Sequence, residues 1–264
     1  MTVRPSRKMR RAITIILLIV SITVPFIAFD VLPAIGDPAS APNTHVSDYY
    51  IEHAIEECNS PNMVTAVIVD YRAFDTMFET TVMFLAGLSV VIILANRPKS
   101  RIPAPASLKR LRDTSGNPVY RTVNKDVMIS IIEPVILIYA MYVLFHGEIS
   151  LGGGFQAGAL IGMTYLLDIM VVGRKRPIFN LPKDKSAALA GIGPFIYVLT
   201  GFISIIGGGL YLEYNKMPLP VHQAELHSLG ITAVEIGVTI GVAGTIITIL
   251  NALMERISFD DDND

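Results

Sequence analysis

Six long apolar runs dominate this chain of 264 residues. They are 18 to 23 residues long and lie at Ala12–Phe29, Asp75–Ala95, Val127–Phe145, Phe155–Val172, Ala187–Gly209 and Leu229–Leu250. A helix of about 20 apolar residues crosses the roughly 30 Å of hydrocarbon in a bilayer, and it satisfies its own backbone polar groups there. Only 17% of the residues are charged, against about 25% in soluble domains. The sequence therefore predicts an all-α, polytopic membrane protein with about six transmembrane helices.

The basic residues alternate between the segments that connect these runs. Five precede the first run, eight lie in residues 97–125 and five lie in residues 174–185. Residues 30–71 contain no Lys or Arg, and residues 210–228 contain only Lys216. By the positive-inside rule, this pattern predicts that both termini are cytoplasmic. A second interpretation treats the first run, which PAIGDPASA follows, as a cleaved signal peptide.

Composition divides the chain into two membrane parts. We expect a two-helix part at 1–95 with an external segment at 30–61, and a four-helix part at 126–254. A basic, proline-containing cytoplasmic linker at 96–125 separates them, and an acidic tail follows at 255–264. Within the external segment, DYYIEHAIEEC has apolar residues at helical spacing, which predicts a short helix at the outer surface.

The stretch HGEISLGGGFQAG, from His146 to Gly158, has two interpretations. A phosphate-binding loop needs a Lys and a Ser or Thr after its glycines, or the spacing GxGxxG after a strand, and this stretch has neither. Glycine also permits the backbone angles of a tight turn. Gly154, Gly158 and Gly162 recur every four residues, as in a small-residue face for helix packing in lipid. We therefore predict a hairpin turn followed by a packing face.

Ionisable residues inside the apolar runs are the candidates for function, because such groups are costly at membrane depth and often line ion paths. A carboxyl group among apolar side chains can exchange a proton near neutral pH. The ion-path candidates are Glu79, Glu235, Asp75, Glu133, His146 and Asp168. Most of them also have a structural interpretation. Asp70, Arg72 and Asp75 would form a salt bridge that fixes a helix start, and Glu235 would form a hydrogen bond between helices. Glu133 would mark a helix entry, Asp168 would point toward Arg174, and His146 would cap a turn.

Other chemistries find little support in the sequence. The single cysteine, Cys58, excludes an internal disulfide or a cysteine-built cluster. His222, Glu225 and His227 do not share one helix face, so we predict no metal site there. We find no nucleophile–base pair and no nucleotide motif, so no catalytic residue and no cofactor is predicted.

The second half of the chain resembles the MnhB/MrpB subunits of multisubunit Na⁺/H⁺ antiporters. The family pattern HGH-x-x-PGGGF-x-G is matched by His146, Gly147, Gly152, Gly153, Gly154, Phe155 and Gly158. The chain departs from it at Glu148, where the family often has His, and at Leu151, where it usually has Pro. The stretch ITAVEIGVTIGVAGTIITIL is similar to the family's TxxxFDxGVxxxVxGxxxTxL, with Glu235 in place of Asp.

The first half resembles a different piece of the same superfamily. NMVTAVIVDYRAFDTMFETTV is similar to the motif NVVxxILVDFRGFDTxGExxV, found near the C-terminal end of MrpA and as the MbhE-like subunit of membrane-bound hydrogenases. Asp70, Arg72, Asp75 and Glu79 match it, whereas Tyr71 replaces Phe and Ala73 replaces Gly. The resemblance implies a fusion of two neighbouring small subunits. It further implies large antiporter-like membrane subunits as partners and Na⁺ and H⁺ as transported ions.

Three hypotheses follow. The first is a non-catalytic membrane subunit that contributes to a Na⁺/H⁺ path and to assembly, in a stand-alone antiporter or a redox-driven complex. The second is a helical spacer that joins larger subunits, with carboxylates that only hold helices together. The third is an independent transporter, which is weakened because the sequence shows no inverted repeats and no paired broken helices.

Overall fold

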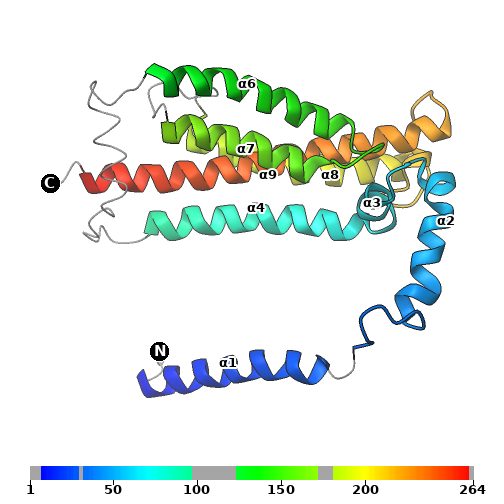
Figure 1. The fold of residues 1–264 in the computed structure, drawn as a ribbon, viewed down its shortest axis with the longest axis horizontal. Helices are drawn as coiled ribbons and strands as arrows, with labels where there is room; N and C mark the ends of the chain where they lie inside the picture. Colours follow the sequence, from blue (N-terminus) through cyan, green and yellow to red (C-terminus); the bar gives the residue numbers. More distant parts are fainter. Residues whose placement is uncertain (1–6, 30–31, 97–122, 172–180, 262–264) are drawn as a thin grey trace. The chain divides into compact units, whose positions relative to one another are not determined.

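A computed structural model describes residues 7–29, 32–96, 123–171 and 181–261, and every regular element in these ranges is helical (Figure 1). This confirms the predicted all-α class. Most of the linker predicted at 96–125 lies outside the described residues. Arg174, the expected neighbour of Asp168, also lies outside them.

The chain divides into two compact units, at Met1–Glu52 and His53–Asp264. The first contains α1 (Arg7–Phe29), a π-helical turn η1 (Pro42–Val46) and the start of α2 (Ser47–Cys58). Helix α1 covers the first predicted run, and its apolar stretch is Arg11–Ile27. Helix α2 confirms the helix predicted from DYYIEHAIEEC.

The second unit is a bundle built around one long helix (Figure 1). Its long helices are α4 (Ala73–Asn96), α6 (Val123–Phe145), α7 (Gly154–Val171), α8 (Lys183–Ile206) and α9 (Gln223–Asp261). Helix α9 packs against α4, α7 and α8, while α6 lies mainly against α7. Accordingly 67% of the apolar α9 window is buried, but only 11% of the α4 window. Helix α9 is therefore the core of the bundle, and α4 presents most of its surface outward.

Among the described residues, four helices are long and apolar enough to cross a membrane: Ala73–Ala95, Val127–Phe145, Lys183–Ile206 and Glu225–Glu255. They coincide with four of the six predicted runs. The total of six crossings and the cytoplasmic position of the termini stay predictions.

Helix α9 is longer than its sequence pattern indicates. The last apolar run ends at Leu250, and we expected a separate acidic tail from residue 255. The helix instead continues to Asp261. Hydropathy detects only the part of a helix that lies in apolar surroundings, whereas backbone hydrogen bonding carries the helix beyond it.

Glycines allow the helices of the bundle to approach closely, as predicted for α7. A Cβ atom on Gly154, Gly158 or Gly162 would lie within 2.8 Å of an atom of α9. On α8, a Cβ atom on Gly193 would lie 2.4 Å from the Cα atom of Gly241 on α9. Small residues at such contacts let helices pack in lipid, where the hydrophobic effect gives no driving force for association.

Short elements complete one end of the bundle. These are α3 (Met63–Thr65), a π-helical turn η2 (Ala66–Tyr71), and a 3₁₀ turn η3 (Tyr214–Lys216) between α8 and α9. They lie at the end that also carries the α6–α7 connection, which we call the Gly-rich loop (residues 146–153).

Candidate ion-path site

The Gly-rich loop is a tight turn, as predicted. Gly153 has a φ of +127°, a conformation that side chains rarely adopt. A Cβ atom on Gly152 would lie 2.4 Å from the carbonyl oxygen of Val143. The Gly153 amide donates to that same oxygen at 3.1 Å. This amide is therefore used within the turn, which agrees with the hairpin interpretation over the phosphate-binding one.

Asn62, ahead of α3, ties the first half of the chain to this loop. Its side-chain Nδ2 donates to the carbonyl oxygens of Gly147 and Ser150, both at 2.7 Å. Its backbone amide donates to the carbonyl of Glu148 at 3.0 Å, and Thr65 donates to Gly147 at 2.7 Å. Sequence reasoning missed these contacts. The only signal in the sequence was the position of Asn62 just before a helical stretch, which is typical of an N-cap residue. The Oδ1 atom of Asn62 accepts a hydrogen bond from the Val64 amide in this way.

Glu148 and Glu235 form the first of two carboxyl pairs. Glu235 is on α9 and only 4% exposed, and it lies close enough to Glu148 in the loop for electrostatic interaction. Glu148 is half-buried and accepts hydrogen bonds from Ser228 at 2.6 Å and Thr232 at 3.1 Å. The sequence singled out Glu235 but gave no reason to pair it with Glu148, since 87 residues separate them.

Glu133 and Asp168 form the second pair, across the α6–α7 contact. They are 4% and 2% exposed, respectively, and they interact electrostatically. Within the described part of the chain, the Oε1 atom of Glu133 is buried without a hydrogen-bond partner. Glu133 is therefore an interior group, and the prediction that it marks a helix entry is wrong. Glu133 instead lies beside Asp168. The helices α6 and α7 run in opposite directions, so these two residues lie at the same height along the α6–α7 contact.

The cluster expected at Asp70, Arg72 and Asp75 divides into two. Arg72 pairs with Asp75 through Nη2 and through Nε, the latter at 2.6 Å, and both side chains are more than half exposed. Asp70 turns away to His227 on α9, with 3.1 Å between its Oδ2 and Nδ1 of the histidine. Helical geometry explains the split, because the π-helical turn η2 ends between residues 70 and 72 and redirects the chain.

Tyrosines pack around this Asp70–His227 contact. Tyr214 is fully buried, donates to the carbonyl of Val69 at 2.9 Å and lies edge-on to the His227 ring. Burial raises the pKa of the Tyr214 phenol well above its usual value, so it stays a neutral donor. These contacts join η2 to the start of α9.

Three further candidates lie outside the interior pairs. Asp75 and Glu79 are exposed on α4. His146 stacks on Tyr142 with ring centroids 4.8 Å apart, and its carbonyl accepts the amides of Ile149 and Ser150 at 3.1 and 3.0 Å. The backbone contacts fit the turn-forming role that we expected for His146.

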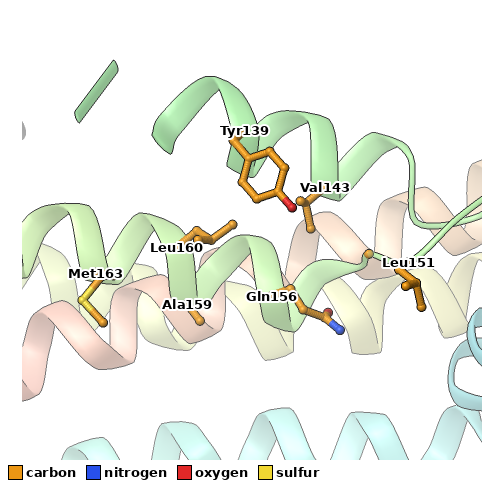
Figure 2. Close-up of a pocket in the computed structure, with 8 residues that line it drawn as sticks. Tyr139, Val143, Leu151, Gln156, Ala159, Leu160 and Met163 are labelled. Carbon is orange, nitrogen blue, oxygen red and sulfur yellow. The ribbon is translucent and has the colours of Figure 1, made fainter. Parts of the chain in front are cut away.

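A groove of about 490 Å³ lies between α6 and α7 beside this loop (Figure 2). Tyr139, Val143, Leu160 and Met163 contribute to its walls, and Gln156 lies at its loop end. Its lining is mainly apolar, as expected for a surface that faces lipid or another apolar helix.

Sequence comparisons match two different family profiles to the two halves of the chain. Residues 125–248 match the profile described as a domain related to the MnhB subunit of Na⁺/H⁺ antiporters, and residues 7–112 match the MbhE profile, which describes one of the subunits of MBH. A putative MnhB-type antiporter subunit of Staphylococcus haemolyticus is 31% identical over 139 residues, which are 51% of this chain and 92% of that protein. The chain belongs to the MnhB family of antiporter subunits.

Other relatives cover both halves of this MnhB-family chain. A probable A/B-type K⁺/H⁺ antiporter protein of Rhizobium meliloti is 25% identical over 74% of this chain, which spans only 21% of that relative. An uncharacterized protein of Methanocaldococcus jannaschii is 30% identical over 70% of this chain and 72% of its own length.

Two solved structures share the fold of this MnhB-family protein. One is the Mrp complex of a Dietzia species, where 96% of this chain superposes on 26% of the other with a TM-score of 0.63 and 24% identity. The other is the membrane-bound sulfane sulfur reductase, an archaeal respiratory membrane complex. There 92% of this chain superposes on 98% of the other, with a TM-score of 0.55 and 26% identity.

Proposed function

We propose that this protein is a non-catalytic membrane subunit that contributes part of a Na⁺/H⁺ path and helps to assemble large antiporter-like subunits. The single observation that carries the proposal is the presence of two carboxyl pairs: Glu148–Glu235, between the Gly-rich loop and α9, and Glu133–Asp168, between α6 and α7. Buried carboxyls in a membrane bundle are costly and are retained where ions or protons move.

The two pairs lie at different depths. Glu235 lies against the first turn of α7, where a Cβ atom on Gly154 would be 2.4 Å from its carbonyl oxygen. Asp168 lies 14 residues further along α7, a rise of about 21 Å. This separation is roughly two thirds of the 30 Å hydrocarbon thickness. Buried hydroxyls lie between them, at Thr239 one turn after Glu235 and at Thr164 one turn before Asp168.

The likeness to the sulfane sulfur reductase supports a place in a redox-driven complex, and the MnhB and Mrp relatives support a stand-alone antiporter. Either setting requires large partner subunits, and the outward faces of α4 and α6 offer them contact. Phe78, Val82 and Leu85 on α4 are all more than half exposed.

The test measures ion movement in the assembled complex. We would reconstitute the complex in liposomes with Glu235→Gln or Glu133→Gln and follow Na⁺-dependent proton movement with a pH-sensitive dye. We expect a fall of at least about tenfold, equal to about 1.4 kcal/mol on the limiting step. Glu56→Gln is the matched control, because Glu56 is exposed on α2, outside the long helices of the bundle.

A second candidate function, a purely structural spacer, is favoured by the glycine contacts of the bundle. Those contacts hold α7 and α8 against α9 of the same chain. Unchanged transport in both glutamine variants, with intact assembly on native gels, would leave the spacer as the function.

A further inference from the structure

We propose that Asp70 and His227 form a pH-sensitive clasp, which holds η2 more firmly against the start of α9 when the imidazole ring is protonated. The proposal goes beyond the ion path described above, because it requires no ion to pass through either carboxyl pair. Three observations carry it: a short contact between two ionisable groups, the lack of a hydrogen bond at either atom, and a position where two differently matched segments of the chain meet.

The two side chains meet in a largely buried position. The Oδ2 atom of Asp70 lies 3.1 Å from Nδ1 of His227, and the side chains are only 20% and 13% exposed, respectively. Within the described part of the chain, both atoms are buried and neither forms a hydrogen bond. A carboxylate oxygen without a donor is costly to bury unless a positive charge lies beside it. The protonated ring supplies that charge, whereas the neutral ring does not.

Arg72 does not supply this charge, although it follows Asp70 by only two residues. Its guanidinium group pairs with Asp75, and both of those side chains are more than half exposed. Arginine keeps its charge at every pH that a protein meets, so an arginine partner would make the contact insensitive to pH. Histidine instead changes its charge between about pH 5 and 8. The charge beside Asp70 is therefore one that a modest change in pH adds or removes.

The other titratable groups around the clasp come from several elements. Tyr214 on η3 lies edge-on to the His227 ring, and burial raises the pKa of its phenol well above the usual value. Burial also raises the pKa of the Cys58 thiol on α2 to about 12, with a further contribution from nearby Asp70. Both groups therefore stay neutral while histidine titrates. The remaining groups have other contacts or are exposed: Tyr71 with Glu57, Glu148 with Ser228 and Thr232, Tyr197 with the Ala73 carbonyl, and the exposed Glu79, His222 and Glu225.

The clasp joins two segments that different profiles match. Asp70 belongs to the MbhE match and His227 to the MnhB match. Two uncharged contacts lie nearby, because Tyr214 donates to the Val69 carbonyl at 2.9 Å and Tyr197 donates to the Ala73 carbonyl at 2.8 Å. These hydrogen bonds persist when the histidine loses its proton. Deprotonation should therefore loosen η2 locally without separating the two segments.

The test measures amide hydrogen exchange in the purified whole complex by mass spectrometry, at about pH 5.5 and about pH 7.5, with labelling times adjusted for the intrinsic effect of pH. Residues 66–71 report on the clasp, and residues 190–204 of α8, which contain no charged side chain, are the internal reference. We expect residues 66–71 to be about fivefold better protected at the lower pH, near the upper end of what exposed ion pairs give.

Three variants assign this difference to the clasp. His227→Gln and Asp70→Asn each keep a polar side chain and should abolish the difference. His222→Gln is the matched control, because His222 is exposed and lies just ahead of α9, and it should preserve the difference. Equal protection of the unchanged protein at the two pH values, or greater protection at the higher pH, would overturn the proposal. A pH effect that persists in His227→Gln would do the same, and Asp70→Asn answers the question independently if that variant does not assemble.

Discussion

Two glycines on one helix give a sharp test of how the bundle is held together. Gly191 and Gly193 are two residues apart on α8, yet their surroundings differ. A Cβ atom on Gly193 would lie 2.4 Å from the backbone N and Cα atoms of Gly241 and 2.6 Å from the carbonyl oxygen of Gly237. A Cβ atom on Gly191 would meet only the ring of Phe84, at an ordinary 3.4 Å. We therefore expect opposite effects from the same substitution.

The magnitudes follow from these contacts. Alanine in place of a helical glycine gains up to about 1 kcal/mol from helix propensity. At Gly193 the methyl group requires α8 and α9 to separate by about 1 Å, and overpacking of this kind costs about 1–3 kcal/mol, or more against rigid backbone. We expect Gly193→Ala to lose about 1–2 kcal/mol and Gly191→Ala to gain about 0.5–1 kcal/mol. The difference of roughly 1.5–3 kcal/mol corresponds to about 10- to 150-fold in the unfolding equilibrium.

Cys58 provides the assay. It is the only cysteine of the chain and is 1% exposed. Burial raises the pKa of its thiol to about 12, which suppresses the reactive thiolate in the folded protein. We would titrate the purified complex with sodium dodecyl sulfate and follow alkylation of Cys58 by peptide mass spectrometry. Equal midpoints for the two alanine variants, or a higher midpoint for Gly193→Ala, would refute the close-packing argument.

Two further predictions concern the Gly-rich end. Asn62→Ala removes two 2.7 Å hydrogen bonds to the loop and should cost about 1–3 kcal/mol. Faster amide exchange in residues 147–153 would reveal this loss, whereas Asn43→Ala, whose side chain bonds only within the first unit, should leave the loop unchanged. The raised pKa of Cys58 predicts that alkylation of the folded protein increases about tenfold per unit from pH 8 to pH 11, because the thiolate is the reactive form. A plateau near pH 9, as expected for the denatured chain, would contradict the burial of this thiol.

Hydropathy located the long helices well. Each predicted run falls on an observed helix, because a span must be both apolar and helical to avoid unpaired backbone groups. The glycine spacing on α7 likewise predicted a packing face, since residues four apart share one side of a helix. Helix α9 extends beyond the last apolar run, because a helix that leaves apolar surroundings changes composition without ending.

The candidate residues show that local sequence pattern does not predict which ionisable side chains pair in the fold. The sequence offers Glu133 and Asp168 as separate ion-path candidates, each with an alternative role near a helix end, and it groups Asp70 with its sequence neighbours. The fold instead pairs Glu133 with Asp168 and Asp70 with His227. Such pairs depend on helix register and on the direction of each chain segment, neither of which leaves a trace in a single sequence.

The sequence by itself determined that this is a helical membrane protein with a tight Gly-rich turn, because burial in lipid and tight glycine turns constrain residue type position by position. Only the tertiary structure decided which ionisable groups face each other. Glu235 gains its significance from Glu148 and from two glycines that leave room beside its carboxyl. That arrangement exists only when α7 and α9 pack at glycine distance, since the electrostatics of a buried group depend on its neighbours in space and not along the chain.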